Sequence, residues 1–140
     1  MTLNTINDWK KLVSKTANMF EEKKWTQITG ELAAYDDMTQ RCFNGGMLCN
    51  LGIDLSKLDD LAVYGEDYYE DYGHTTDVVD LGIKSIVCSL GHGHSPSFTE
   101  IPFYIGHLND IHELKGKELQ KQFDKDVNIA IRKSKGKKKK

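Results

Sequence analysis

The residue with the clearest capacity for chemistry is Cys42, which begins an apolar segment, 42–52, that contains no carboxylate. Phe43, Met47 and Leu51 recur in this segment at the spacing of one helical face. At the N-terminus of such a helix, the helix dipole and the unpaired N–H groups stabilise a thiolate. The neighbouring Arg41 would add positive charge, so the sequence predicts that Cys42 could act as a nucleophile.

A nucleophilic cysteine also needs a base and a group that orients this base. Candidates follow later in the chain: His92, His94, His107, Asn109 and Asp110. A cysteine followed by a histidine and then an asparagine is the order found in papain-like hydrolases, with Cys42, His92 and Asn109 as the catalytic candidates. The alternative is structural, because a free cysteine usually behaves as a small buried hydrophobe and Asn-Asp pairs often cap or turn the backbone.

Histidines are concentrated in one part of the chain. Four of the five, His92, His94, His107 and His112, lie within 21 residues. A His-x-His pair with a nearby carboxylate can bind zinc or another divalent ion, so the sequence predicts a possible metal site. Its candidate ligands are His92, His94, His107 and Asp110. The alternative is that glycine-flanked histidines in the segment 91–97 are solvated loop residues.

The segment 64–73 has a different composition, with four tyrosines and four carboxylates in ten residues. Aromatic faces beside carboxylates suit the recognition of a basic partner protein, or mimicry of nucleic acid, although solvated loops also have this composition. The predicted binding surface consists of two loop regions, 64–76, which contains this segment, and 91–112. The candidate binding residues are Arg41, Tyr68, Tyr69, Tyr72, His94 and Asp110.

Helical periodicity indicates which elements would position these groups. It predicts helices over residues 8–23, 41–52, 54–63, 77–90 and 116–133, although the β-branched residues of 77–90 would also suit a strand. Residues 25–30 suit a short strand, whereas 31–35 and 101–108 fit either a strand or a helix. Gly52 is placed to end the central helix in a left-handed conformation, and Gly45-Gly46 inside this helix implies close backbone packing.

Length and composition indicate one domain. The 140 residues are 39% hydrophobic, and no apolar run approaches the roughly 20 residues that cross a bilayer. The N-terminal residues lack the layout of a signal peptide, so we expect a cytoplasmic protein that does not bind membranes. Three cysteines without CxxC spacing argue against a disulfide framework or a zinc knuckle. The expected fold is a mainly helical α+β domain over residues 1–131, with a small strand pair at most.

The net charge of −2 hides an asymmetry, because residues 132–140 carry seven positive charges and leave −9 on the rest of the chain. We expect this lysine-rich tail to be disordered. It could contact nucleic-acid phosphates without reading sequence, or it could serve only to keep the protein in solution.

The order of landmarks resembles a family of small, uncharacterised bacterial and phage domains, known as a domain of unknown function. In that family a tryptophan, a polar residue and a glycine precede a Cys-x-x-Gly-Ala-Leu-like helix start, and an Asn-Asp pair introduces the last helix. The corresponding segments here are 25–30, 41–48 and 108–110, within about residues 25–130. Two extra residues separate Gln27 from Gly30, and Gly46 replaces the usual alanine. The resemblance implies a phage or bacterial accessory protein and no particular reaction.

These observations lead to three functional hypotheses. The first is a non-enzymatic accessory module that binds a host protein or a small ligand and needs no cofactor. The second is a cysteine-dependent or metal-dependent hydrolase that uses Cys42 or the cluster of His92, His94, His107 and Asp110. The third is a weak nucleic-acid binder that works through the lysine-rich tail.

Overall fold

The computed structural model describes residues 3, 6–58, 61, 68 and 101–138. Its first helix, α1 (Ile6–Glu21), confirms the amphipathic helix that the sequence predicts over residues 8–23. The apolar face of α1 is buried along its whole length through Trp9, Leu12, Val13, Ala17 and Phe20. Residues at this spacing form one stripe, so α1 packs against the core with a single face.

A small sheet follows α1. Strands β1 (Thr26–Gln27), β2 (Ala33–Ala34) and β3 (Asp37–Arg41) form it in the order β1-β3-β2. β1 pairs with β3 in parallel, with Gln27 opposite Arg41, and β2 pairs with β3 antiparallel, with Ala33 also opposite Arg41. The sequence analysis allowed a pair of strands at most, and the sheet has three. The parallel pairing of β1 with β3 brings Thr26 opposite Gln40, and local periodicity does not indicate a pairing of this kind.

Helix α2 (Phe43–Asn50) begins directly after β3 and is buried from Phe43 to Leu48. Its two glycines confirm the predicted close packing. A Cβ at Gly45 would lie 1.9 Å from the backbone oxygen of Leu32, and a Cβ at Gly46 would lie 2.9 Å from both Thr16 Cγ2 and Trp25 Cζ3. Gly52 adopts the left-handed conformation predicted for it, with a φ of +97°. Thus α2 is wedged between the sheet and α1.

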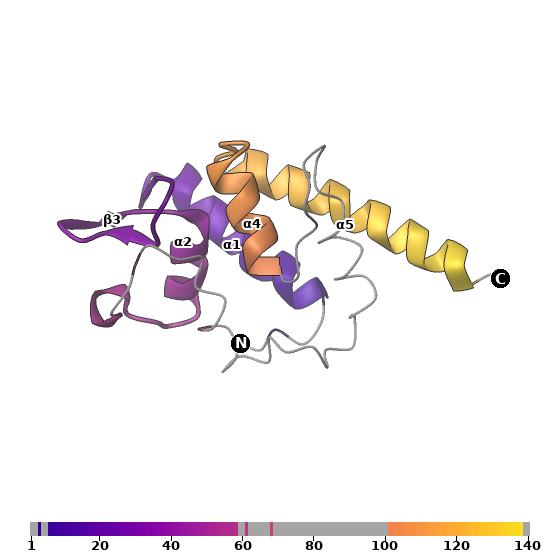
Figure 1. Ribbon diagram of the computed structural model, residues 1–140, viewed down its shortest axis with the longest axis horizontal. Helices are drawn as coiled ribbons and strands as arrows, with labels where there is room; N and C mark the ends of the chain where they lie inside the picture. The colour runs from indigo at the N-terminus through magenta and orange to yellow at the C-terminus, as the bar shows by residue number, and fades with distance from the viewer. Residues whose placement is uncertain (1–2, 4–5, 59–60, 62–67, 69–100, 139–140) are drawn as a thin grey trace.

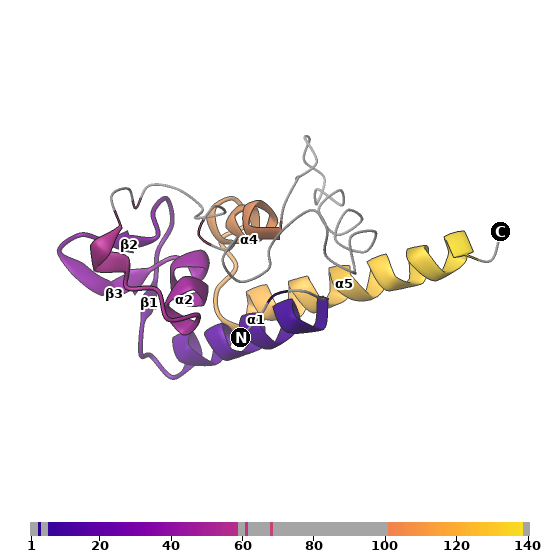
Figure 2. The same cartoon turned by 90° about the horizontal axis from the view of Figure 1, so that it is seen from below.

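Two further helices complete the described part of the chain. α4 (Ile101–Asp110) packs on α2 and α5. Residues 101–108, for which the sequence allowed a strand or a helix, are therefore helical. α5 (Lys117–Lys138) runs beside α1 in the opposite direction and then continues past it, so that the C-terminus projects away from the sheet (Figure 1 and Figure 2).

One core joins these elements. Apolar side chains of α1, α2, α4 and α5 meet in it, among them the fully buried Phe43, Tyr104 and Phe123. The predicted core face of α5 is confirmed at Leu119, Phe123 and Val127. The described residues therefore form a mainly helical α+β domain, as the sequence predicts. No helix within these residues is both long enough and apolar enough to cross a membrane.

Two expected boundaries differ from the structure. The helix predicted over residues 54–63 is a single 3-10 turn, η1 (Leu55–Lys57), within the described residues, and the Asp54 side chain caps it by accepting from Ser56 N–H. α5 extends to Lys138, so helix occupies most of the segment 132–140 that was expected to be disordered. Lysine is a good helix former, so these residues can continue a helix already established by packing. The helix predicted over 77–90 and the loop 91–97 lie outside the described residues.

Candidate functional site

A buried asparagine, Asn109, joins three parts of the fold. Its Oδ1 accepts hydrogen bonds from Gln27 Nε2 at 2.7 Å and from Phe43 N–H at 3.1 Å. Its Nδ2 donates to the backbone oxygen of Ile28 at 2.9 Å and to Asp110 Oδ1 at 2.6 Å. The last turn of α4 is thereby attached to β1 and to the first residue of α2. We call Asn109 and these four partners the Asn109 network.

Gln27 extends the Asn109 network to the start of α5. It is 8% exposed, and its Nε2 also donates to the backbone oxygen of Leu114 at 2.8 Å. Its Oε1 accepts from Gly116 N–H at 2.9 Å. The Gln27 side chain thus hydrogen-bonds to Asn109 in α4 and to the backbone of Leu114 and Gly116, so it sets the position of the α4–α5 connection relative to the sheet.

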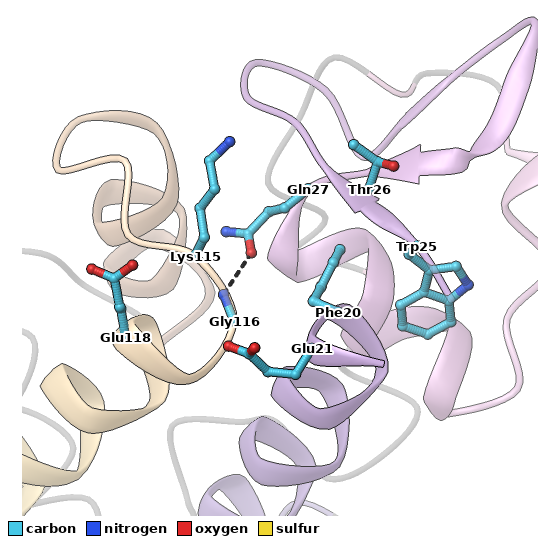
Figure 3. A pocket seen from close by; sticks show the side chains of 8 residues that line it. All are labelled: Phe20, Glu21, Trp25, Thr26, Gln27, Lys115, Gly116 and Glu118. Carbon is cyan, nitrogen blue, oxygen red and sulfur yellow. Dashed lines mark hydrogen bonds between the residues drawn. The ribbon is translucent and has the colours of Figure 1, made fainter. Parts of the chain in front are cut away.

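A pocket of about 250 Å³ opens beside Gln27. It lies between the end of α1, strand β1 and the start of α5, and Figure 3 shows the side chains around it. Its lining residues are Phe20, Glu21, Trp25, Thr26, Gln27, Lys115, Gly116 and Glu118. We call it the α1–α5 pocket.

The α1–α5 pocket combines aromatic and charged walls. The rings of Phe20 and Trp25 meet edge to face, with centroids 5.5 Å apart. Glu21 Oε1 accepts from Lys117 N–H at 3.0 Å, which holds this carboxylate at the positive N-terminal end of α5. Glu118 adds a second carboxylate, and Lys115 adds one ammonium group. The charged side chains in the lining therefore sum to one negative charge at neutral pH.

Cys42 lies at the N-terminus of α2, as predicted, but its surroundings oppose the thiolate hypothesis. The thiol is 5% exposed and caps the helix by accepting from Gly45 N–H at 3.3 Å. Burial raises the pKa of the Cys42 thiol to about 12, and the negative charge of Asp110 acts in the same direction. At neutral pH the sulfur is therefore a protonated core group, because desolvation outweighs the helix-terminal stabilisation of the anion.

Arg41, predicted both to assist Cys42 and to bind a partner, points elsewhere. It is 7% exposed, and its guanidinium donates to the backbone oxygen of Met38 through Nε, at 2.8 Å, and through Nη2. The guanidinium also lies over the Trp25 ring, 4.5 Å from its centroid. Arg41 therefore orders β3 and Trp25, and its charge is directed toward the ring.

The predicted metal ligands are separated in part. His107 is 8% exposed, and its Nε2 lies 3.0 Å from Nε2 of His112. Asp110, in contrast, accepts from Gly30 N–H at 3.3 Å and from Asn109, on the side of the sheet. Within the part of the chain that the structure describes, no three histidine, cysteine, aspartate or glutamate side chains are grouped to hold a metal ion.

Most of the remaining candidates lie outside the described residues, namely His92, His94, Tyr69 and Tyr72. Tyr68 is half-buried and packs against the core. Reasoning on the residue types alone missed Gln27 and the α1–α5 pocket. The segments that hold Gln27, Phe43 and Asn109 are distant in sequence and meet in the Asn109 network.

Comparisons of the chain with known protein families, with characterised proteins and with solved structures find no match.

Proposed function

We propose that this protein is a non-enzymatic binding module that takes a cationic group, from a small ligand or a partner protein, in the α1–α5 pocket. The observation that carries this proposal is the lining of the pocket, which contains two aromatic rings and two carboxylates. Aromatic rings and carboxylates both attract cations. The proposal includes the wider role expected from the sequence, a phage or bacterial accessory protein that acts in the cytoplasm.

The charged side chains of the pocket lining, and the net charge of the rest of the chain, favour a cationic ligand over an anionic one. Glu21 is held in place by Lys117 N–H, and Glu118 adds a second carboxylate to the lining, whereas Lys115 offsets only one of these two charges. Outside the segment 132–140 the chain carries a net charge of −9. A negative body raises the local concentration of cations and favours their approach.

The aromatic wall suits a flat, delocalised cation. Trp25 already accepts one guanidinium, that of Arg41, at 4.5 Å from its ring centroid. Phe20 and Trp25 provide apolar surface for the aliphatic part of such a guest. The volume of about 250 Å³ is below the roughly 300–1,000 Å³ of sites for drug-sized ligands, so one side chain or a small amine fits the site.

Butylguanidinium and its neutral counterpart butylurea provide a matched pair of probes with nearly the same shape. We expect butylguanidinium to shift the amide NMR signals of Gly116 and the side-chain amide signals of Gln27, which face the pocket. Butylurea should leave these signals almost unchanged because it lacks the charge. A Glu118→Gln variant should weaken the response, whereas Glu22→Gln, exposed and outside the pocket lining, should retain it. Equal responses to both probes, or signals elsewhere in the chain that move instead, would contradict the proposal.

The hydrolase hypothesis is tested separately through Cys42. Because its thiol is buried and protonated, we expect Cys42 to be alkylated more slowly than the half-buried Cys49 between pH 7 and pH 9. Mass spectrometry of peptides after timed exposure to iodoacetamide measures both rates in one sample. A Cys42 that reacts faster than Cys49 below pH 8 would restore the nucleophile hypothesis.

A further inference from the structure

The pair of His107 and His112 lies where α4 ends and the chain turns toward α5, and it goes beyond the binding function proposed for the α1–α5 pocket. The two Nε2 atoms are 3.0 Å apart, and the ring centroids are 4.8 Å apart with the planes at 70°. If both Nε2 atoms lay on the line between the two ring centroids, the centroids would be more than 4.8 Å apart. The rings are therefore inclined to the line that joins the two nitrogens.

We propose that His107 and His112 form a binding site for a late first-row divalent metal ion such as Zn²⁺ or Ni²⁺, held by both Nε2 atoms. With metal–nitrogen bonds of about 2.0–2.1 Å, a tetrahedral ion separates two ligand nitrogens by about 3.3 Å, and a right-angled pair by about 2.9 Å. The observed 3.0 Å lies between these values. A shift of a few tenths of an ångström would fit either geometry.

The backbone holds the two rings together before any ion binds. Ile111 N–H and His112 N–H both donate to the backbone oxygen of His107, at 2.9 Å and 3.3 Å, and Leu114 N–H donates to Leu108 O at 3.0 Å. Glu113, which follows His112, is left-handed with a φ of +52° and turns the chain toward α5. Because this turn already orders both side chains, little conformational entropy is lost when they bind an ion.

The donor atoms determine the class of metal. Two imidazole nitrogens favour zinc, nickel or copper over magnesium or calcium, which prefer oxygen ligands. His107 is 8% exposed and His112 is half-buried. An imidazole nitrogen binds a metal ion through its lone pair, so the ion would need the tautomer of each ring in which Nε2 carries no hydrogen.

The test uses full-length, metal-free protein titrated with Zn²⁺ in a calorimeter, together with NMR of the histidine ring nitrogens. We expect one equivalent of Zn²⁺ to bind and the Nε2 signals of His107 and His112 to move together. A His112→Gln variant should bind at least about tenfold more weakly, because loss of a direct ligand exceeds the effect of losing a supporting group. His107→Gln, checked for folding by circular dichroism, should show the same loss.

A variant with both His92→Gln and His94→Gln is the matched control, because it removes as many histidines as the two single variants together. It should change the affinity less than threefold. Absence of Zn²⁺ binding to the unmodified protein, an unchanged affinity in His112→Gln, or a loss confined to the double variant would each overturn the proposal.

Discussion

Asn109 uses all four of its hydrogen-bonding positions inside the fold. An Asn109→Ala variant would leave the Phe43 N–H, the Ile28 carbonyl and part of the Gln27 amide without partners. Each buried unsatisfied group costs about 1–3 kcal/mol, so we expect the free energy of unfolding to fall by about 3 kcal/mol or more. Urea denaturation measures this change, with the exposed Asn128→Ala on α5 as control. A loss below about 1 kcal/mol would show that the network is replaceable.

Asp126 on α5 gives a pH-dependent prediction. Its side chain is 3% exposed and accepts from Gln122 Nε2 at 3.1 Å. Burial raises the pKa of Asp126 from its ordinary 3.8 to about 7. A carboxyl whose pKa is higher in the folded state stabilises that state most below about pH 4, and this contribution is lost as the pH rises through 7.

An Asp126→Asn variant mimics the protonated carboxyl at every pH. Its melting temperature relative to the unmodified protein should therefore rise between pH 5 and pH 8. Asp54→Asn is the control, because hydrogen bonds from Ser56 lower the pKa of the exposed Asp54 and its titration lies below this range. The Asp54→Asn difference should stay constant from pH 5 to pH 8. A constant difference for Asp126→Asn as well would contradict the assigned pKa shift.

Between helices and strands, the two glycines of α2 decide how closely the elements approach. An added Cβ at Gly45 would lie 1.9 Å from backbone oxygen of Leu32, whereas at Gly46 it would meet side chains of α1 and Trp25 at 2.9–3.1 Å. Overpacking of the second kind costs about 1–3 kcal/mol, partly offset by the roughly 1 kcal/mol helix preference of alanine. We therefore expect Gly45→Ala to destabilise the fold more than Gly46→Ala, because a backbone atom cannot rotate away.

Urea denaturation of the two variants tests this order. Gly52→Ala serves as reference, because nothing lies within 4 Å of its added Cβ and only the left-handed backbone is strained. That strain costs about 1–2 kcal/mol. If Gly45→Ala were no more destabilised than Gly52→Ala, α2 would not be packed against the Leu32 backbone as described.

At the scale of the whole molecule, we expect residues 132–140 at the end of α5 to contribute positive charge but little stability. Val127 is the last residue of α5 with a described buried side chain, and Arg132 is exposed. Deletion of residues 132–140 should therefore change the free energy of unfolding by less than about 1 kcal/mol at physiological salt, which thermal or urea unfolding would measure. A larger loss would mean that the C-terminal turns of α5 belong to the folding unit.

The same deletion tests the nucleic-acid hypothesis. If the seven positive charges of residues 132–140 contact phosphates, the logarithm of the affinity for duplex DNA should fall by up to about 6 for each tenfold rise in salt. We expect this salt-dependent binding in fluorescence anisotropy with the full chain and its loss after the deletion. Binding that survives the deletion would exclude the tail as the contact.

The sequence by itself determined the local elements. The periodicity of Trp9, Leu12 and Phe20 predicted α1, and that of Phe43 and Met47 predicted α2, because side chains three or four residues apart share one helical face. Cys42 was correctly placed at a helix N-terminus, and Gly52 at a left-handed position. These properties depend on neighbours within one or two turns.

Only the tertiary structure decided the chemistry of these groups. The pKa of Cys42 depends on burial by elements distant in sequence, and this burial outweighs the helix terminus that had suggested a thiolate. Gln27 and Asn109 are 82 residues apart, and the α1–α5 pocket joins the end of α1 to the start of α5. His107 pairs with His112 where α4 ends, and Glu113, directly after His112, is left-handed although its residue type does not signal this conformation. Such contacts arise from packing across the whole chain, which local spacing does not encode.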